Sequence, residues 1–297
     1  MNNIRGKMKK HIKSILIILF LCNIVVAQTM VDKSIMKSPY LGQKPPGLVP
    51  ELFAPEVISR SDYFEHSAAL FTPDGNEVYW SAKPNNERYY KIYFMKLVDG
   101  IWTQPNVASF CKENEYYQQF TLSPDGKKLY FTNGEKLLYV EKRNNGWSSP
   151  LAVPSIITAG TDANICCITS NGSIYFISRP TYDVYISRIA NGNYSTPEKL
   201  GEQINSDDTR ENSVYVDPDE SYMIIEASKD AATCELFISF RMNDNSWSER
   251  QKLPIKWGRF PSVSLDGKYL FFMTREGIYW VSAKIIEELR PNPYILM

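Results

Sequence analysis

Hydrophobic and polar positions follow one pattern that recurs along most of the chain. Each unit holds a short run in which every second residue is apolar, and the run ends in a tight turn. The five turns begin at Thr72, Ser123, Thr169, Asp217 and Ser264, so their starts are 46 to 51 residues apart. An alternation of period two is typical of a strand with one buried face, so each turn is predicted to follow a β-strand.

Three more short strands are predicted in each unit. In the second unit they are Lys128–Phe131, Leu137–Val140 and the segment from Trp147 to Pro150. The last of them pairs an aromatic residue with a proline, which suits an outer edge strand because proline donates no ladder hydrogen bond. Four short strands that recur at this period indicate an all-β protein built as a β-propeller.

The fifth unit lacks a fourth strand after Val281, and the early segment 50–59 supplies a matching one. That segment carries Phe53 and Pro55 in the places of the aromatic residue and the proline. We expect it to complete the last blade and to close the ring, because closure removes exposed strand edges. The prediction is a propeller of five four-stranded blades. Six blades, the alternative, would require a repeat that the sequence lacks.

The turns themselves combine three residue types with complementary backbone preferences. In Ser123-Pro-Asp-Gly126, proline presets φ, aspartate caps its own backbone and glycine accepts a positive φ. The turn aspartates lack the alternating spacing of a calcium loop, so capping is favoured over metal binding. The third turn lacks the proline and the fourth ends in Glu220, so both are expected to differ locally.

Residues 1–27 have the composition of an export signal. Five basic residues precede an apolar run at 15–21, and small residues stand before Gln28. The run is shorter than the roughly 20 residues of a membrane span, so no transmembrane segment is expected after cleavage. Lipidation at Cys22 is disfavoured because Leu21 precedes it. The location predicted is the periplasm or the extracellular space.

The predicted domain organisation follows from these segments. An N-terminal arm is expected at 28–49 and one propeller domain at 50–292. The blades are expected at about 62–110, 111–158, 159–205, 206–256 and 257–284, with 50–59 completing the last.

Charge and cysteine content exclude some classes of partner and site. Without residues 1–27 the chain holds 28 basic and 33 acidic residues, which disfavours nucleic acid and anionic membranes as partners. The remaining cysteines are Cys111, Cys166, Cys167 and Cys234. They have no CxxC spacing, which argues against zinc. Buried free thiols are the favoured reading, although an exported protein could oxidise them.

The repeat resembles a known family. Ser123-Pro-Asp-Gly-Lys-Lys-Leu-Tyr-Phe131, a following Leu-Tyr-Val strand and Gly-Trp-x-x-Pro are similar to the TolB-type, WD40-like β-propeller repeat, over residues 65–283. The last repeat also resembles exported propellers common in Bacteroidetes. The resemblance implies a propeller, export and a binding platform, and no single chemistry. TolB carries an N-terminal α/β domain where this chain has a short arm, so its envelope role does not transfer.

Polar residues at the beginnings of the innermost strands form the candidate site. They should gather at one channel mouth and suit a polar small molecule, a glycan or a peptide end. The alternative is a hydrated polar ring without a ligand. The candidate ligand-binding residues are His66, Ser67, Gln118, Asn164, Arg210, Glu211, Asn212 and Arg259.

Catalysis at this mouth would depend on His66, the only histidine after residue 27. One histidine excludes a three-histidine metal site and leaves one base for a Ser-His-Asp triad. Glu65 and Glu211, with Tyr116 or Tyr117, could form a carboxylate site of the glycosidase kind. Catalysis would need His66 and Glu211 at one small pocket, whereas a scaffold predicts an open, wide mouth.

Two enzyme families with related folds fit less well. The Asp-box of sialidases is absent, and oligogalacturonate lyases, which the repeat also resembles, rely on several histidines.

These observations lead to one main hypothesis and one alternative. The main hypothesis is an exported, monomeric binding module that is not an enzyme and uses no cofactor or metal. Its partner would be an envelope protein, a polar small molecule or a glycan. The alternative is a polysaccharide hydrolase or lyase that uses the same mouth.

Overall fold

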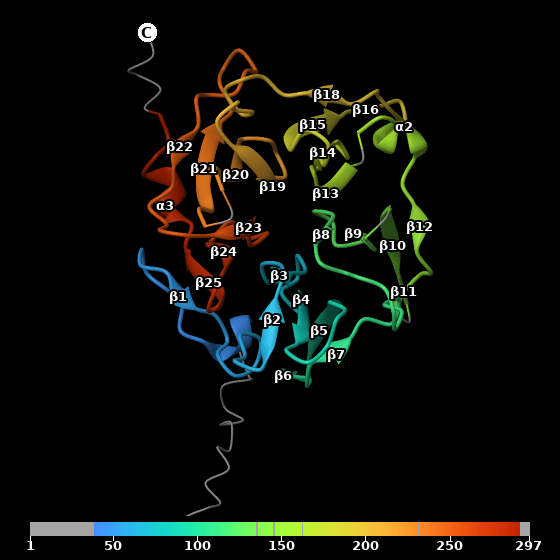
Figure 1. Ribbon diagram of the computed structural model, residues 1–297. Helices are drawn as coiled ribbons and strands as arrows, with labels where there is room; N and C mark the ends of the chain where they lie inside the picture. The colour runs from blue at the N-terminus through green and yellow to red at the C-terminus, as the bar shows by residue number, and fades with distance from the viewer. Residues whose placement is uncertain (1–38, 135, 145, 162, 231, 292–297) are drawn as a thin grey trace, which may run out of the picture.

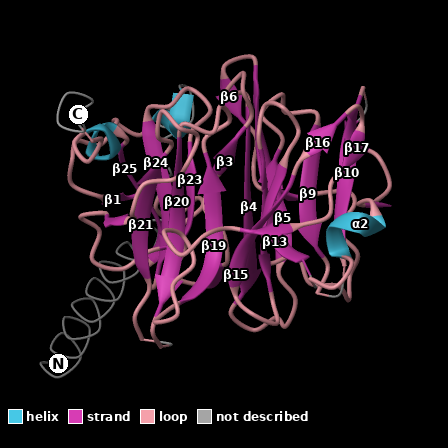
Figure 2. Ribbon diagram, turned by 90° about the horizontal axis from the view of Figure 1, so that it is seen from above, coloured by secondary structure: helices cyan, strands magenta, loops and turns pink. Residues whose placement is uncertain are grey.

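Five blades of antiparallel strands stand around a central channel in the computed structural model, which describes residues 39–291 except 135, 145, 162 and 231 (Figure 1). The innermost strands of the sheets surround the centre and the short outer strands lie at the periphery. The strands run between two faces that carry the loops (Figure 2). The chain is therefore a five-bladed β-propeller, as its repeats predict. Residues 1–27 lie outside the described residues.

The blades follow one another along the chain. Blade 1 contains β2 (Tyr63–Glu65), β3 (Leu70–Phe71), β4 (Glu77–Pro84), β5 (Lys91–Val98), β6 (Ile101–Trp102) and β7 (Asn106–Val107). Blade 2 contains β8 (Phe120–Leu122), β9 (Lys128–Thr132), β10 (Leu137–Arg143), β11 (Gly146–Trp147) and β12 (Leu151–Ala152). Blade 3 contains β13 (Ala163–Ile168), β14 (Ile174–Ser178), β15 (Asp183–Ser187) and β18 (Glu198–Lys199), with the hairpin β16 (Ile189–Ala190) and β17 (Asn193–Tyr194) beside it.

The last two blades have four strands each. Blade 4 contains β19 (Arg210–Val216), β20 (Tyr222–Ser228), β21 (Glu235–Phe240) and β22 (Gln251–Lys252). Blade 5 contains β23 (Arg259–Val263), β24 (Tyr269–Thr274), β25 (Gly277–Ser282) and β1 (Glu51–Leu52). Short helical turns complete the structure: η2 (Pro39–Gly42), α2 (Ser155–Thr158) and α3 (Lys284–Glu287). None of the helices in the described part of the chain has the length and apolar character needed to cross a bilayer.

The outer strands are broken where the sequence places proline. In blade 1, β6 and β7 flank Pro105, and in blade 2, β11 and β12 flank Pro150. Blade 4 shows the same interruption although Arg250 stands there, between an isolated bridge at Trp247 and β22. The break therefore does not depend on proline. Proline is tolerated at this position because the backbone there donates no hydrogen bond to the ladder.

The ring closes as predicted, through the N-terminal strand. β1 pairs antiparallel with β25, with Glu51 opposite Trp280, and the Phe53 amide donates to the Ile278 carbonyl at 2.8 Å. The Phe53 ring is fully buried and lies 5.0 Å from Trp280 and 5.1 Å from Phe271, centroid to centroid. Closure therefore rests on both backbone pairing and an aromatic core.

Part of the predicted arm also packs on this closure. The Tyr40 ring lies between Phe71 of blade 1 and Tyr269 of blade 5, 4.9 Å from each centroid. The side chain of Gln43 donates to the Leu52 carbonyl at 2.8 Å and accepts from the Ala54 amide at 2.7 Å. Residues 39–49 are thus bound to the propeller surface beside the closing strand.

The hydrophobic core is divided among the interfaces between neighbouring blades. One cluster joins blade 5 to blade 1 around Phe53, Phe71 and Trp280, and each other neighbouring pair of blades shares a cluster of its own. Successive side chains of a strand point to opposite faces of its sheet, and each face is covered by a neighbouring blade. Each strand therefore contributes to the clusters on both sides of its blade.

Four of the five turns use glycine at a positive φ, as predicted. The carboxylate of Asp125 accepts the Ser123 hydroxyl at 2.6 Å and the Lys127 amide at 3.0 Å, so the turn aspartate is a cap. In the third turn, Ser170 replaces proline and its amide donates to the Pro218 carbonyl of the next blade at 2.7 Å. The third turn thus differs from the others, as predicted, by one additional hydrogen bond to the neighbouring blade.

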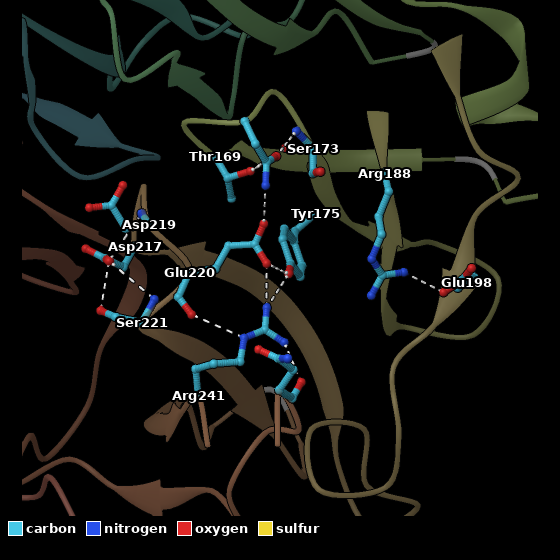
Figure 3. Close-up of polar contacts among 12 residues, drawn as sticks. Thr169, Ser173, Tyr175, Arg188, Glu198, Asp217, Asp219, Glu220, Ser221 and Arg241 are labelled. Carbon is cyan, nitrogen blue, oxygen red and sulfur yellow. Dashed lines mark hydrogen bonds and ion pairs between the residues drawn. The ribbon is translucent and has the colours of Figure 1, made fainter. Parts of the chain in front are cut away.

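The fourth turn differs more, because Glu220 takes the place of glycine with a φ of 59°. Its carboxylate accepts hydrogen bonds from the Tyr175 hydroxyl at 2.8 Å and from the side-chain amide of Asn171 at 3.1 Å. It also pairs with Arg241 (Figure 3). Tyr175 and Asn171 belong to blade 3, so the strained residue joins two blades.

A substitution in the closing segment tests the contribution of closure. We expect Phe53→Ala to lower the free energy of unfolding by about 3–5 kcal/mol, because it empties a fully buried aromatic site. Leu48→Ala, in the arm just before the closing segment and half-exposed, is the control and should cost less than about 0.5 kcal/mol. Urea unfolding measures both. Equal stability of the two variants would contradict closure through Phe53.

The turn at Glu220 offers a second test. Glycine fits the positive φ better, yet we expect Glu220→Gly to destabilise the protein by about 1–2 kcal/mol because Tyr175 and Arg241 lose a charged partner. Asp99→Gly is the matched control, since Asp99 has a φ of 50° and an exposed side chain. It should leave the midpoint of thermal unfolding unchanged or raise it. A higher midpoint in Glu220→Gly would remove the interblade role.

Candidate functional site

The central channel narrows to a waist formed by one residue from each blade. The residues are Leu70, Thr121, Cys167, Tyr215 and Ser262, which line the cavities on both sides of it. The cavity toward the beginnings of the innermost strands has a volume of about 40 Å³ and the other about 30 Å³. Such spaces hold a few water molecules and no larger ligand. The channel is thus narrower than the open, wide mouth expected of a scaffold.

The cysteines of the described residues are structural thiols. Cys111, Cys167 and Cys234 are free, and the side chain of Cys166 is outside what the structure describes. The Cys167 sulfur accepts from the Val216 amide at 3.2 Å, and burial raises the pKa of its thiol to about 12. The thiol at the waist is therefore neutral and unreactive near neutral pH.

His66 lies at one mouth of the channel, packed between aromatic rings. Its imidazole lies 4.7 Å from Phe260 and 5.0 Å from Tyr90, centroid to centroid, and Nδ1 is buried without a hydrogen-bond partner. Burial, and then the nearby charge of Arg259, lower the pKa of His66 to about 4. The imidazole is neutral at physiological pH and offers a buried acceptor or donor at the mouth.

Arg259 stands beside His66 and is held by a fully buried carboxylate. Its Nε donates to Glu226 Oε1 at 2.8 Å, and Glu226 also accepts the Ser213 hydroxyl at 2.6 Å and the Phe260 amide at 3.0 Å. Three donors satisfy this buried charge, so the pair fixes β20, β19 and β23 relative to one another. The guanidinium of Arg259 remains partly exposed at the mouth.

Glu211 does not join His66. Its carboxylate is almost completely buried, pairs with Arg250 at 2.9 Å and accepts the Thr209 hydroxyl at 2.9 Å. Burial raises the pKa of Glu211 in spite of these partners. Among the described contacts none connects Glu211 to His66, so the two-residue catalytic site considered above is not assembled.

The remaining candidates have mixed roles. Ser67 accepts the Ser81 amide at 2.8 Å, and Asn212 donates to the Ser228 hydroxyl at 2.8 Å, so both satisfy groups of their own blade. Asn164 Oδ1 is buried without a partner. Arg210 stacks on Tyr182 at 5.1 Å, and the Gln118 backbone lies close to the His66 imidazole. Of the candidates, Arg259 and the backbone of Gln118 thus lie close to His66.

The two tyrosines considered for catalysis also belong elsewhere. The Tyr117 hydroxyl accepts from the Lys112 amide at 2.9 Å and contacts Glu115 at 3.0 Å, while Arg88 donates to the Tyr116 hydroxyl at 3.0 Å. Both interactions organise the loop before blade 2. Among the described residues, no group of three or more histidine, cysteine or carboxylate side chains is placed to hold a metal ion.

Sequence reasoning missed Glu226 and Phe260. Glu226 is a lone carboxylate within the apolar run Tyr222–Ala227. Its place in an otherwise apolar strand could have indicated a buried, paired charge. Phe260 was hidden because β23 shifts register between Arg259 and Ser262, and its φ of 50° places it outside a regular strand. A bulge re-aims side chains, so counting by twos from the turn fails there.

Glu65 is the last residue of β2 and precedes His66 in the chain. Its Oε1 accepts the Arg60 amide at 3.3 Å, and burial raises the pKa of its carboxyl to about 7. The two neighbours therefore respond to pH in opposite directions. A raised carboxyl pKa removes stability as the pH increases from 4.5 to about 7, and a lowered imidazole pKa removes stability as the pH decreases from 6.5 to about 4.

Single substitutions should separate these two effects. We expect Glu65→Gln to be more stable than the unmodified protein above about pH 7, by on the order of 1–3 kcal/mol, and equal to it at about pH 4. His66→Gln has no imidazole to protonate, so it should not lose this part of the stability as the pH decreases. Urea unfolding between about pH 4 and pH 8 measures both. Parallel stability curves for all three proteins would contradict the burial of these groups.

The comparisons with known proteins bear on the fold. No protein-family model and no curated protein matches the chain. Among solved structures, TolB from Acinetobacter baumannii is similar at 18% identity over 74% of this chain and 52% of that chain, with a TM-score of 0.47. The chain thus spans about half the length of that TolB.

Other similar structures come from different functional classes. The periplasmic gluconolactonase PpgL of Pseudomonas aeruginosa matches at 11% identity over 70% of this chain and 63% of that chain, with a TM-score of 0.43. The Cps50 (Swd1) β-propeller domain of Myceliophteria thermophila matches at 10% identity over 73% and 83%, with a TM-score of 0.40. What these proteins share with this chain is the propeller. The five-bladed β-propeller itself is defined by the chain's own sheet topology.

Proposed function

We propose that the protein is an exported, non-catalytic binding module that holds a protein partner on the mouth face. The observation that carries the proposal is a rim of exposed and half-exposed aromatic side chains that contact lysine or arginine, around a channel too narrow for a ligand. Phe64, 54% exposed, lies under the Lys83 ammonium at 5.0 Å, and Tyr182, 37% exposed, lies under Arg210. Both pairs belong to the mouth end of their blades.

A second group of the same kind extends the rim at blades 1 and 2. Arg88 lies over Tyr89 at 5.4 Å and donates to the Tyr116 hydroxyl, and Tyr89 and Tyr116 pack edge to face at 4.9 Å. Tyrosine and arginine are enriched among the residues that dominate protein–protein binding. The polar residues His66, Gln118 and Arg259 lie inside this rim, where they suit a polar group of the partner.

Export rests on the pattern of residues 1–27 and on the resemblance to TolB-type repeats. A protein of the cell envelope or the extracellular space is therefore the class of partner to test, with a polar ligand or glycan at the same mouth as a weaker candidate. The engagement of Glu211 by Arg250 favours binding over turnover, because no described contact brings Glu211 to His66.

Two double variants on opposite faces test the proposal. Tyr182→Ala with Arg210→Ala removes one rim group, and Val98→Ala with Ile101→Ala removes exposed apolar side chains at the far face. We expect the unmodified protein and the far-face variant to capture the same envelope protein, with affinity at least tenfold weaker for the rim variant by calorimetry. Equal affinities, with folding verified by thermal unfolding, would remove the mouth face as the binding surface.

One observation favours a second candidate, hydrolysis or elimination on a polysaccharide. Burial raises the pKa of Glu65, the residue before His66 in the chain, to about 7, and a carboxyl with such a pKa can act as a general acid or base. This candidate predicts turnover on a glycan panel that Glu65→Gln abolishes. Inactivity across the panel, or activity retained in Glu65→Gln, would count against it.

A further inference from the structure

A second cavity lies away from the channel, between blades 4 and 5 and beside the closing strand. Its volume is about 480 Å³, within the usual range of small-molecule sites and far above that of the channel. Its apolar lining includes Trp257, Phe272, Tyr279, Ile255 and Pro50. The proposed mouth function uses none of these residues.

Charge in this cavity is unbalanced. The Arg275 guanidinium lies 5.4 Å from the centre of the Trp257 indole, and it donates a long hydrogen bond, at 3.4 Å, to the Ala232 carbonyl. No carboxylate among the described residues pairs with Arg275, whereas Arg241, Arg250 and Arg259 each have one. Lys256, which also lines the cavity, is exposed and has no ion pair with a described residue.

The one carboxylate in the cavity is already engaged. Glu276 accepts the Tyr279 hydroxyl at 2.6 Å. Lys256 and Arg275 together exceed it by one positive charge, which matches a ligand with a single negative charge better than a phosphate dianion. Arginine presents a planar fork that suits a carboxylate, and stacking on Trp257 holds that fork in place.

We propose that this cavity, named here the Arg275 cleft, binds a small organic monocarboxylate with an apolar or aromatic body. The carboxylate pairs with Arg275, with Lys256 at the edge, and the body packs against Phe272 and Tyr279. A free organic acid and the C-terminal residue of a peptide share this chemistry, so the test must separate them.

The test uses ligand titration of the whole protein, with the Trp257 indole N–H signal in NMR as the readout and Trp257→Phe to assign it. The probes are 3-phenylpropanoate, its neutral amide, and a tetrapeptide ending in phenylalanine with a free or an amidated C-terminus. We expect 3-phenylpropanoate to shift the signal and its amide not to do so. Binding of the free tetrapeptide more tightly than of 3-phenylpropanoate identifies a peptide end, and the reverse identifies a free acid.

Matched variants locate the binding. Arg275→Gln should weaken 3-phenylpropanoate at least tenfold and Lys256→Glu should weaken it less, whereas Arg143→Gln, an exposed arginine paired with Glu141, should have no effect. The rim variant Tyr182→Ala with Arg210→Ala should also bind normally, which separates this cleft from the proposed mouth function. Equal shifts with acid and amide, unchanged affinity in Arg275→Gln, or no shift at millimolar probe would overturn the proposal.

Discussion

The pairing of β1 with β25 is the contact on which the rest of the propeller depends. Each blade packs both faces against neighbours, so the ring is continuous only when blade 5 has its outer strand and blade 1 meets it. Phe53 and Tyr40 add aromatic contacts to the backbone ladder at this junction. The junction therefore stabilises the first and last blades together, and an open ring would expose unpaired strand edges.

The channel mouth owes its rigidity to two buried ion pairs. Glu226 with Arg259 and Glu211 with Arg250 each bury a carboxylate that has at least two hydrogen-bond donors. Buried charges contribute little net stability when paired, but the loss of one partner is costly. Such pairs therefore hold in place the strands and loops that meet at the mouth.

The fold could be predicted from the sequence because its determinants are local. In all five units the alternation ends in a tight turn within about ten residues, although the full Pro-Asp-Gly signal occurs only in the first two turns. The candidate site was predicted only in part, because its geometry depends on register shifts. The bulges between Glu211 and Ser213 and between Arg259 and Ser262 interrupt the two-residue count. Partners such as Arg250, which directly precedes β22, are far from Glu211 in the sequence, and no local pattern indicates them.

Closure by the N-terminal strand also sets an order of events during synthesis. Blades 1 to 4 are built from neighbouring hairpins and can form as the chain emerges, whereas β1 is made first and its partner β25 last. The ring can close only when nearly the whole chain is available. A chain that stops before β25 leaves the strands at both ends of the ring unpaired. Incomplete chains therefore expose strand edges that finished chains cover. Chaperones and proteases act on such incompletely folded chains.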